Sequence, residues 1–153
     1  MSLLLVHAAA TLFMAGLAWF VQVVHYPLFA GVPDADPGSA ARWRRYAAAH
    51  GRRTTWVVAA PMLAELACAG LLALAPPPGV PAWATWIGVG LLAVVWLSTA
   101  LLQVPAHGRL AGGFEAAVHA RLVRSSWLRT AAWSLRALLA LALIHAAAGR
   151  FPA

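Results

Sequence analysis

Glu65 stands near the middle of one long apolar segment, and Arg136 holds a similar position in another. An ionisable side chain in hydrocarbon costs roughly 3 kcal/mol on insertion scales, so it marks a functional site by default. Counted from Thr54 and Ser126 at a rise of about 1.5 Å per residue, both residues lie about 15–16 Å deep. Opposite charges at matching depth predict a buried ion pair, which serves either as a structural clasp or as part of a site.

Four histidines and two glutamines are expected near the same ends of the apolar segments. These are the ends joined by the two arginine-rich connections. The six residues are His25, His50, His107, His119, Gln22 and Gln103. Imidazole serves as a general base or a metal ligand near neutral pH. Each histidine alone is typical of a membrane interface, but together they predict a shared polar site. His7 and His145 fall at the outer face and are expected to be separate from the polar residues named so far.

The residue types suggest three sets of roles. The candidate catalytic residues are His107 or His119 as general base, Arg129 as the stabiliser of an oxyanion, and Glu65. The candidate substrate-binding residues are Gln22, Gln103, Tyr26, Trp96 and Arg136. If a metal is bound, iron or copper suits the nitrogen-rich set of candidate ligands, which are His25, His50, His107, His119, Glu65 and Glu115. Glu115 and His119 are four residues apart, which predicts one helical face.

These side chains must be positioned by helices. The chain has 153 residues, of which 63% are hydrophobic and 10% charged, outside the range of a soluble domain. Four stretches reach the roughly 20 apolar residues that cross a bilayer. The sequence therefore predicts one all-α domain, an integral membrane four-helix up-down bundle, with spans over residues 3–25, 54–75, 82–104 and 126–148. Pro105 is expected to end the third span, and the single Cys68 allows no internal disulfide.

The net charge of +7 does not indicate nucleic-acid binding, because the arginines gather in two connections. Both Arg-rich loops fall on one face, which the positive-inside rule makes cytoplasmic. We therefore expect an inner-membrane location, with both termini outside and anionic lipid headgroups as partners. Asp34 and Asp36 mark a turn in the first connection, and Arg150 stands alone near the C-terminus. The cytoplasmic arginines are Arg42, Arg44, Arg45, Arg52, Arg53, Arg109, Arg121 and Arg124.

Three short motifs carry a family resemblance: His-Tyr-Pro-Leu-Phe at 25–29, Ser-Thr-Ala-Leu-Leu-Gln-Val-Pro-Ala-His at 98–107, and Trp-Leu-Arg-Thr at 127–130. Their order resembles the anthrone-oxygenase-like family of four-helix membrane proteins. The resemblance places Gln103 and His107 at the family's two Asn positions, Pro105 at its Pro, and Arg129 and Thr130 at its Arg-Thr. The chain departs from the pattern at both Asn positions and lacks the Asn between Trp and Arg.

Three functions fit these features. The leading hypothesis is a small oxygenase-like membrane oxidoreductase acting on a lipophilic substrate, aromatic or quinonoid, that enters from the cytoplasmic leaflet. The second is a haem-binding or electron-transfer module that uses two of the histidines as axial ligands. The third is a carrier or assembly protein without catalysis, for which Glu65 and Arg136 resemble a transporter's charge pair. A chain of this length without an internal repeat would need a homodimer to act as such a carrier.

Overall fold

The computed structural model describes residues 1–31 and 38–149, and within these ranges it contains helices and short connections but no strand. This confirms the all-α prediction. The expected turn at Asp34 and Asp36, like Arg150, lies outside the described residues. In chain order the elements are α1 (Ser2–Phe20), the π-helix η1 (Val21–His25), α2 (Tyr26–Phe29), α3 (Ser39–Leu74), α4 (Ala82–Ser98), the π-helix η2 (Thr99–Gln103), α5 (Val104–Gly112) and α6 (Ala116–Ala148).

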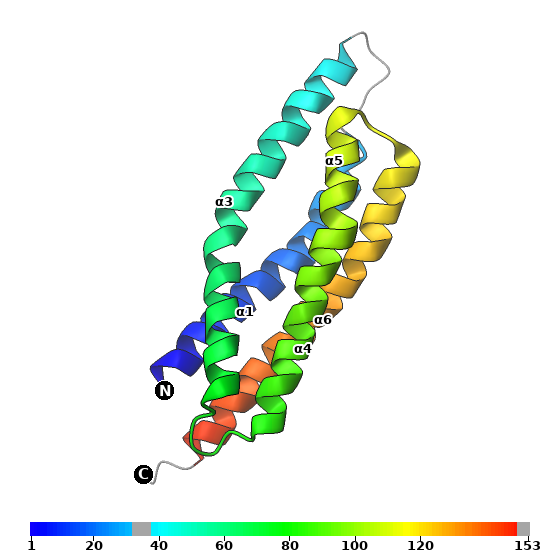
Figure 1. Ribbon diagram of the computed structural model, residues 1–153. Coiled ribbons are helices and arrows are strands. Elements are labelled where there is room, and N and C mark those ends of the chain that lie inside the picture. The colour runs from blue at the N-terminus through cyan, green and yellow to red at the C-terminus, as the bar shows by residue number, and fades with distance from the viewer. Residues whose placement is uncertain (32–37, 150–153) are drawn as a thin grey trace.

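The elements form four long rods, because η1 and α2 continue α1 while η2 and α5 continue α4 (Figure 1). The α1 rod packs against α3 and α6, and α4 packs against the same two helices. The beginning of α1, the α3–α4 connection and the end of α6 lie at one end of the bundle (Figure 1). The α5–α6 connection and the beginning of α3 lie at the other. The chain is therefore an up-down four-helix bundle.

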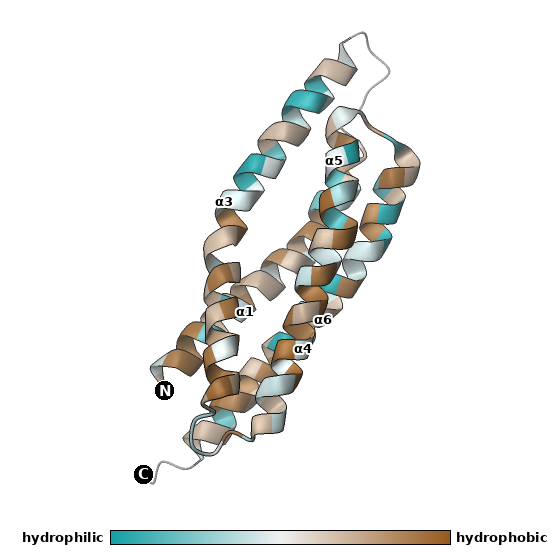
Figure 2. Cartoon of the chain, viewed as in Figure 1, coloured by the Kyte–Doolittle hydropathy of each residue, from teal (hydrophilic) through white to brown (hydrophobic). Residues whose placement is uncertain are grey.

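The helices pack through small side chains and expose large apolar ones. Ala15, Ala18, Ala132 and Ala137 are buried in one core cluster, where small residues let helix backbones approach closely. Large apolar side chains instead cover much of the outer surface; Leu28, Trp56, Leu74 and Leu138 each expose at least 65% of their area. Hydrophobic residues predominate along much of the four rods, and hydrophilic ones are more frequent toward the beginning of α3 (Figure 2). All four rods are long and apolar enough to cross a membrane, over Ser2–Phe29, Ser39–Leu74, Ala82–Gly112 and Ala116–Ala148.

The third rod does not end at Pro105, contrary to the sequence-based expectation. The N–H of Val104 bonds to the carbonyl of Thr99, five residues back, and the next residue is the proline. The first rod repeats this arrangement, with Tyr26 bonding to Val21 just before Pro27. A proline has no N–H to donate, so a wide π turn placed directly before it lets the chain continue as helix.

A tight turn joins α3 to α4. The N–H of Val80 bonds to the carbonyl of Pro77 at 3.0 Å, with Pro78 and Gly79 between them. Gly79 has a φ of 88°, the left-handed conformation that the third residue of a type II turn requires. This turn makes α3 and α4 antiparallel neighbours in the bundle.

Candidate functional site

A cavity of about 260 Å³ lies between all four rods, in the half of the bundle that contains both π-helices. This is larger than the roughly 150 Å³ cavity that accommodates benzene in an engineered protein core. Most of its wall is apolar, including Met14, Leu17, Val58, Met62 and Val95. The polar side chains on the wall are fewer and include Tyr26, His50, Gln103, His107 and Arg129. An apolar cavity with a few converging polar groups is typical of a small-molecule site.

Both π-helices lie in this half of the bundle, and each carries a buried glutamine that is hydrogen-bonded to α6. Gln22 on η1 donates from Nε2 to the carbonyl of Val123 at 3.1 Å. Gln103 on η2 donates from Nε2 to the hydroxyl of Ser125 at 3.5 Å. Single π turns inside α-helices occur frequently at functional sites. Here they widen the two rods where the cavity lies.

The four predicted histidines surround Phe29 instead of a common polar point. The ring centroid of Phe29 lies 5.3 Å from His25, 5.6 Å from His50, 6.5 Å from His107 and 6.0 Å from His119. Three of the imidazoles form a row, with 4.4 Å between the centroids of His25 and His50 and 5.9 Å between those of His50 and His107. An apolar ring therefore fills the place where a shared metal would sit.

The two predicted catalytic histidines have different neighbours. His107 Nε2 lies 3.3 Å from the hydroxyl of Tyr26, and both residues line the cavity. His119 Nε2 lies 3.0 Å from the backbone carbonyl of Tyr26. A carbonyl only accepts, so His119 donates from Nε2 and holds the backbone of Tyr26 in place. Of the two, His107 is the candidate base and His119 supports the residue beside it.

The two carboxylates of the predicted metal-ligand set do not join the four histidines. Glu65 is paired with Arg136, and the carboxylate of Glu115 pairs with Arg109 at 2.9 Å on the surface. Glu115 also precedes the first residue of α6 with an extended backbone, so the expected face shared with His119 does not form. Within residues 1–31 and 38–149, no three or more His, Cys, Asp or Glu side chains are arranged to hold a metal ion.

The predicted substrate-binding residues divide between cavity wall and surroundings. Tyr26 and Gln103 line the cavity, whereas Gln22 is buried beside it and Trp96 packs against the core cluster. Arg136 lies deeper, with Glu65. Sequence reasoning missed Thr99 and Trp133 on the wall. Thr99 lies four residues before Gln103, a spacing that would have placed it on the same face.

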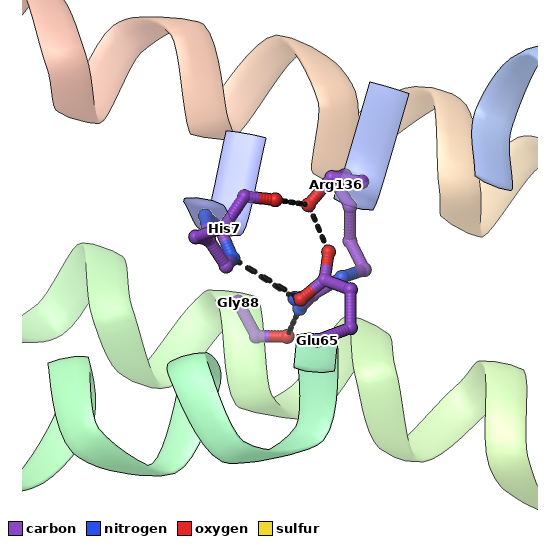
Figure 3. Close-up of polar contacts among 5 residues, drawn as sticks. His7, Glu65, Gly88 and Arg136 are labelled. Carbon is purple, nitrogen blue, oxygen red and sulfur yellow. Dashed lines mark hydrogen bonds and ion pairs between the residues drawn. The ribbon is translucent and has the colours of Figure 1, made fainter. Parts of the chain in front are cut away.

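A second polar cluster lies about one turn beyond the cavity, where Glu65 meets Arg136 as predicted (Figure 3). Arg136 Nη2 donates to Glu65 Oε2 at 2.5 Å, and Arg136 Nη1 donates to the carbonyl of Gly88. Glu65 Oε1 accepts from the hydroxyl of Thr11. Glu65 exposes 0% and Arg136 1% of its surface. Because each charge is paired and hydrogen-bonded, both can remain ionised inside the bundle.

His7 belongs to this cluster, so the expectation that it would be separate is wrong. His7 Nε2 lies 3.2 Å from Arg136 Nη2 and 3.3 Å from Glu65 Oε2, and its ring is buried (Figure 3). A depth counted from the cytoplasmic ends of α3 and α6 does not compare these helices with the N-terminal half of α1. The four-residue step from His7 to Thr11 was the available signal, because it places both on one helical face. We call His7, Thr11, Glu65, Gly88 and Arg136 the clasp.

The clasp predicts strong coupling between its two charges. Removing either one leaves the other buried and unpaired, so Glu65→Gln or Arg136→Gln should each destabilise the protein by about 3–5 kcal/mol. The double variant should lose clearly less than the sum of the two single losses. Thermal stability in detergent, measured for all four proteins of the cycle, tests this.

The matched control is Glu65→Gln with Arg129→Gln. Arg129 lies on α6 like Arg136, but about 10 Å from it along the helix axis at a rise of about 1.5 Å per residue, on the wall of the cavity. Those two losses should add, since distant sites without shared partners behave independently. Additive losses in the Glu65 and Arg136 cycle as well would show that the two charges do not stabilise each other.

No protein-family profile, curated protein or solved structure matches this chain. The resemblance to the anthrone-oxygenase-like family therefore stays a prediction.

Proposed function

We propose that this chain is a small oxygenase-like membrane oxidoreductase that acts on a lipophilic aromatic or quinonoid substrate in the cavity. One observation carries the proposal: a largely apolar cavity has His107, Tyr26, Gln103 and Arg129 among the polar residues on its wall. Such a wall suits a flat apolar molecule with few oxygen functions. The large apolar side chains on the outer surface support entry of such a molecule from the bilayer.

His107 is placed to act as the general base. In the tautomer in which Nε2 donates to the hydroxyl of Tyr26, the other ring nitrogen, Nδ1, carries the lone pair that takes a proton. The packing of His107 against Phe29 keeps the ring oriented. A positioned base typically contributes a factor of about 100 to 10,000 to the rate.

Arg129 is placed to stabilise the charge that proton removal creates. Its guanidinium contacts Ser126 at 3.3 Å and lies on the cavity wall. A fixed cation in an apolar cavity stabilises a developing oxyanion far better than water does. The oxidant in this proposal is dioxygen. When the substrate has an activated methylene group, one oxygen atom of dioxygen becomes the carbonyl oxygen of the product. The other oxygen atom forms water with the two hydrogens that the methylene loses.

The imidazoles do not fit a four-histidine metal site, because they surround Phe29, and no step of the proposed reaction passes through a metal. His25 and His50 stack with 4.4 Å between their ring centroids, which leaves no room for a metal ion between the two rings. The purified protein should therefore show no Soret band and no stoichiometric iron or copper. A visible spectrum with elemental analysis tests this expectation, and a Soret band would favour the haem alternative instead.

The catalytic roles predict a specific pattern of activity losses. Anthrone is a suitable probe, and dioxygen uptake by the protein in nanodiscs is the measurement. His107→Gln should lower the rate about 100-fold or more, and Arg129→Gln should have an effect of similar size. His145→Gln is the matched control, since His145 is exposed at the opposite end of the bundle. Undiminished uptake by the His107→Gln protein would overturn the assignment of the base.

We also propose that the protein lies in the inner membrane with both termini outside. The eight arginines that the sequence assigned to connections lie on α3, α5 and α6 at one end of the four rods, whereas Arg150 follows the fourth rod in the sequence. The positive-inside rule makes the Arg-rich side cytoplasmic. The cavity, which lies toward that side, would then open to substrates from the cytoplasmic leaflet.

Cysteine labelling of intact cells tests this orientation. In a Cys68→Ala background, Pro78→Cys in the α3–α4 turn should react with a membrane-impermeant maleimide. Ala117→Cys, exposed near the beginning of α6, should react only after the cells are opened. The reverse pattern would contradict the proposed orientation.

A further inference from the structure

Buried polar atoms without a partner are concentrated on the two π-helices. Among the described residues, seven buried side-chain nitrogen or oxygen atoms have no hydrogen-bond partner, and four of these belong to Gln22, His25, Thr99 and Gln103. Two of the four, Gln103 Oε1 and Thr99 Oγ1, belong to residues that line the cavity. Buried polar atoms are normally satisfied, so these two atoms are left for a partner from outside the chain, either water or a ligand.

The orientation of the Gln103 amide follows from its neighbours. The hydroxyl of Ser125 donates its only hydrogen to the carbonyl of Leu122 at 3.1 Å, so toward Gln103 it can only accept. The nitrogen of the amide must therefore face Ser125, as it does at 3.5 Å. A flipped amide would place two acceptors against each other. Gln103 exposes 1% of its surface, so its free oxygen is shielded from bulk water. An amide oxygen can only accept a hydrogen bond, so its partner must be a donor.

Thr99 is left unpaired for a different reason. In a helix a threonine hydroxyl commonly bonds to the carbonyl four residues back, which for Thr99 is that of Val95. That carbonyl already accepts from Ser98 at 3.1 Å. The hydroxyl of Thr99 is therefore free to accept or donate, one helical turn from the free oxygen of Gln103.

We propose that Gln103 Oε1 and Thr99 Oγ1 form a subsite that recognises a hydroxyl group on an aromatic ligand. A phenolic hydroxyl can donate to Gln103 and accept from Thr99 together. A quinone carbonyl or an ether oxygen only accepts, so it would leave Gln103 Oε1 buried and unpaired. The subsite therefore favours the hydroxyl-bearing, reduced form of a substrate over a carbonyl-only product. This inference rests on the proposed cavity and names the substrate class that it selects.

The test compares two bicyclic ligands that differ in one donor, 2-naphthol and 2-methoxynaphthalene. Binding to the protein in nanodiscs is followed by quenching of tryptophan fluorescence, with empty nanodiscs correcting for partition into lipid. Naphthol should bind at least about tenfold more tightly than the ether, because a site with an unpaired acceptor rejects an analogue that lacks the donor. In Gln103→Leu the preference should fall to about one.

Gln22→Leu is the matched control. Gln22 is also buried on a π-helix with a free Oε1, but it does not line the cavity, so the preference should stay as in the native protein. Thr99→Val provides a second variant should Gln103→Leu fail to fold; it removes the donor that both ligand oxygens can accept from, so it should weaken the binding of both ligands and keep the preference for naphthol. Equal binding of both ligands to the native protein would overturn the subsite and leave the cavity proposal standing. Binding of neither ligand would overturn both.

Discussion

The ion pair between Glu65 and Arg136 is the interaction on which the arrangement of the four rods depends. A carboxylate and a guanidinium that are both fully buried must satisfy each other, and neither can move away without exposing the other to an apolar interior. The pair is also bonded to Thr11 on α1 and to the carbonyl of Gly88 on α4. One cluster thereby connects all four rods at a single level and sets their relative positions along the bundle.

The cavity begins about one turn from this level. Met14, Met62 and Trp133 line it, and each stands three residues from a member of the clasp on the same helix. The clasp holds the rods together on one side of the cavity, and Phe29 with its surrounding rings fills the other. Between them, η2 leaves the amide oxygen of Gln103 and the hydroxyl of Thr99 without a hydrogen-bond partner. Unsatisfied polar groups lower the stability of a folded protein, so their presence in the cavity wall is most simply explained by a ligand.

The sequence was sufficient to predict the helices and the central ion pair, because both follow from hydrophobic length and from depth along a regular rise. It was not sufficient for the histidines. Their shared side of the bundle was correctly expected, but the contact of all four with Phe29 depends on how α2 packs against its neighbours. The π turns do not follow from the sequence, because helical periodicity assumes 3.6 residues per turn and a proline normally predicts the end of a helix. The contact of His7 with the ion pair depends on the depth of α1 relative to α3 and α6, which the sequence of α1 alone does not determine.

The central claim is that the cavity beside His107 holds an aromatic ligand in contact with Gln103 and Arg129. An experimental structure of the protein in nanodiscs with bound 2-naphthol tests it most directly. The account predicts the ring between α1, α3, α4 and α6, with its hydroxyl within hydrogen-bonding distance of Gln103 Oε1. A ligand found only on the outer, lipid-facing surface, with the cavity closed by side chains, would contradict the account.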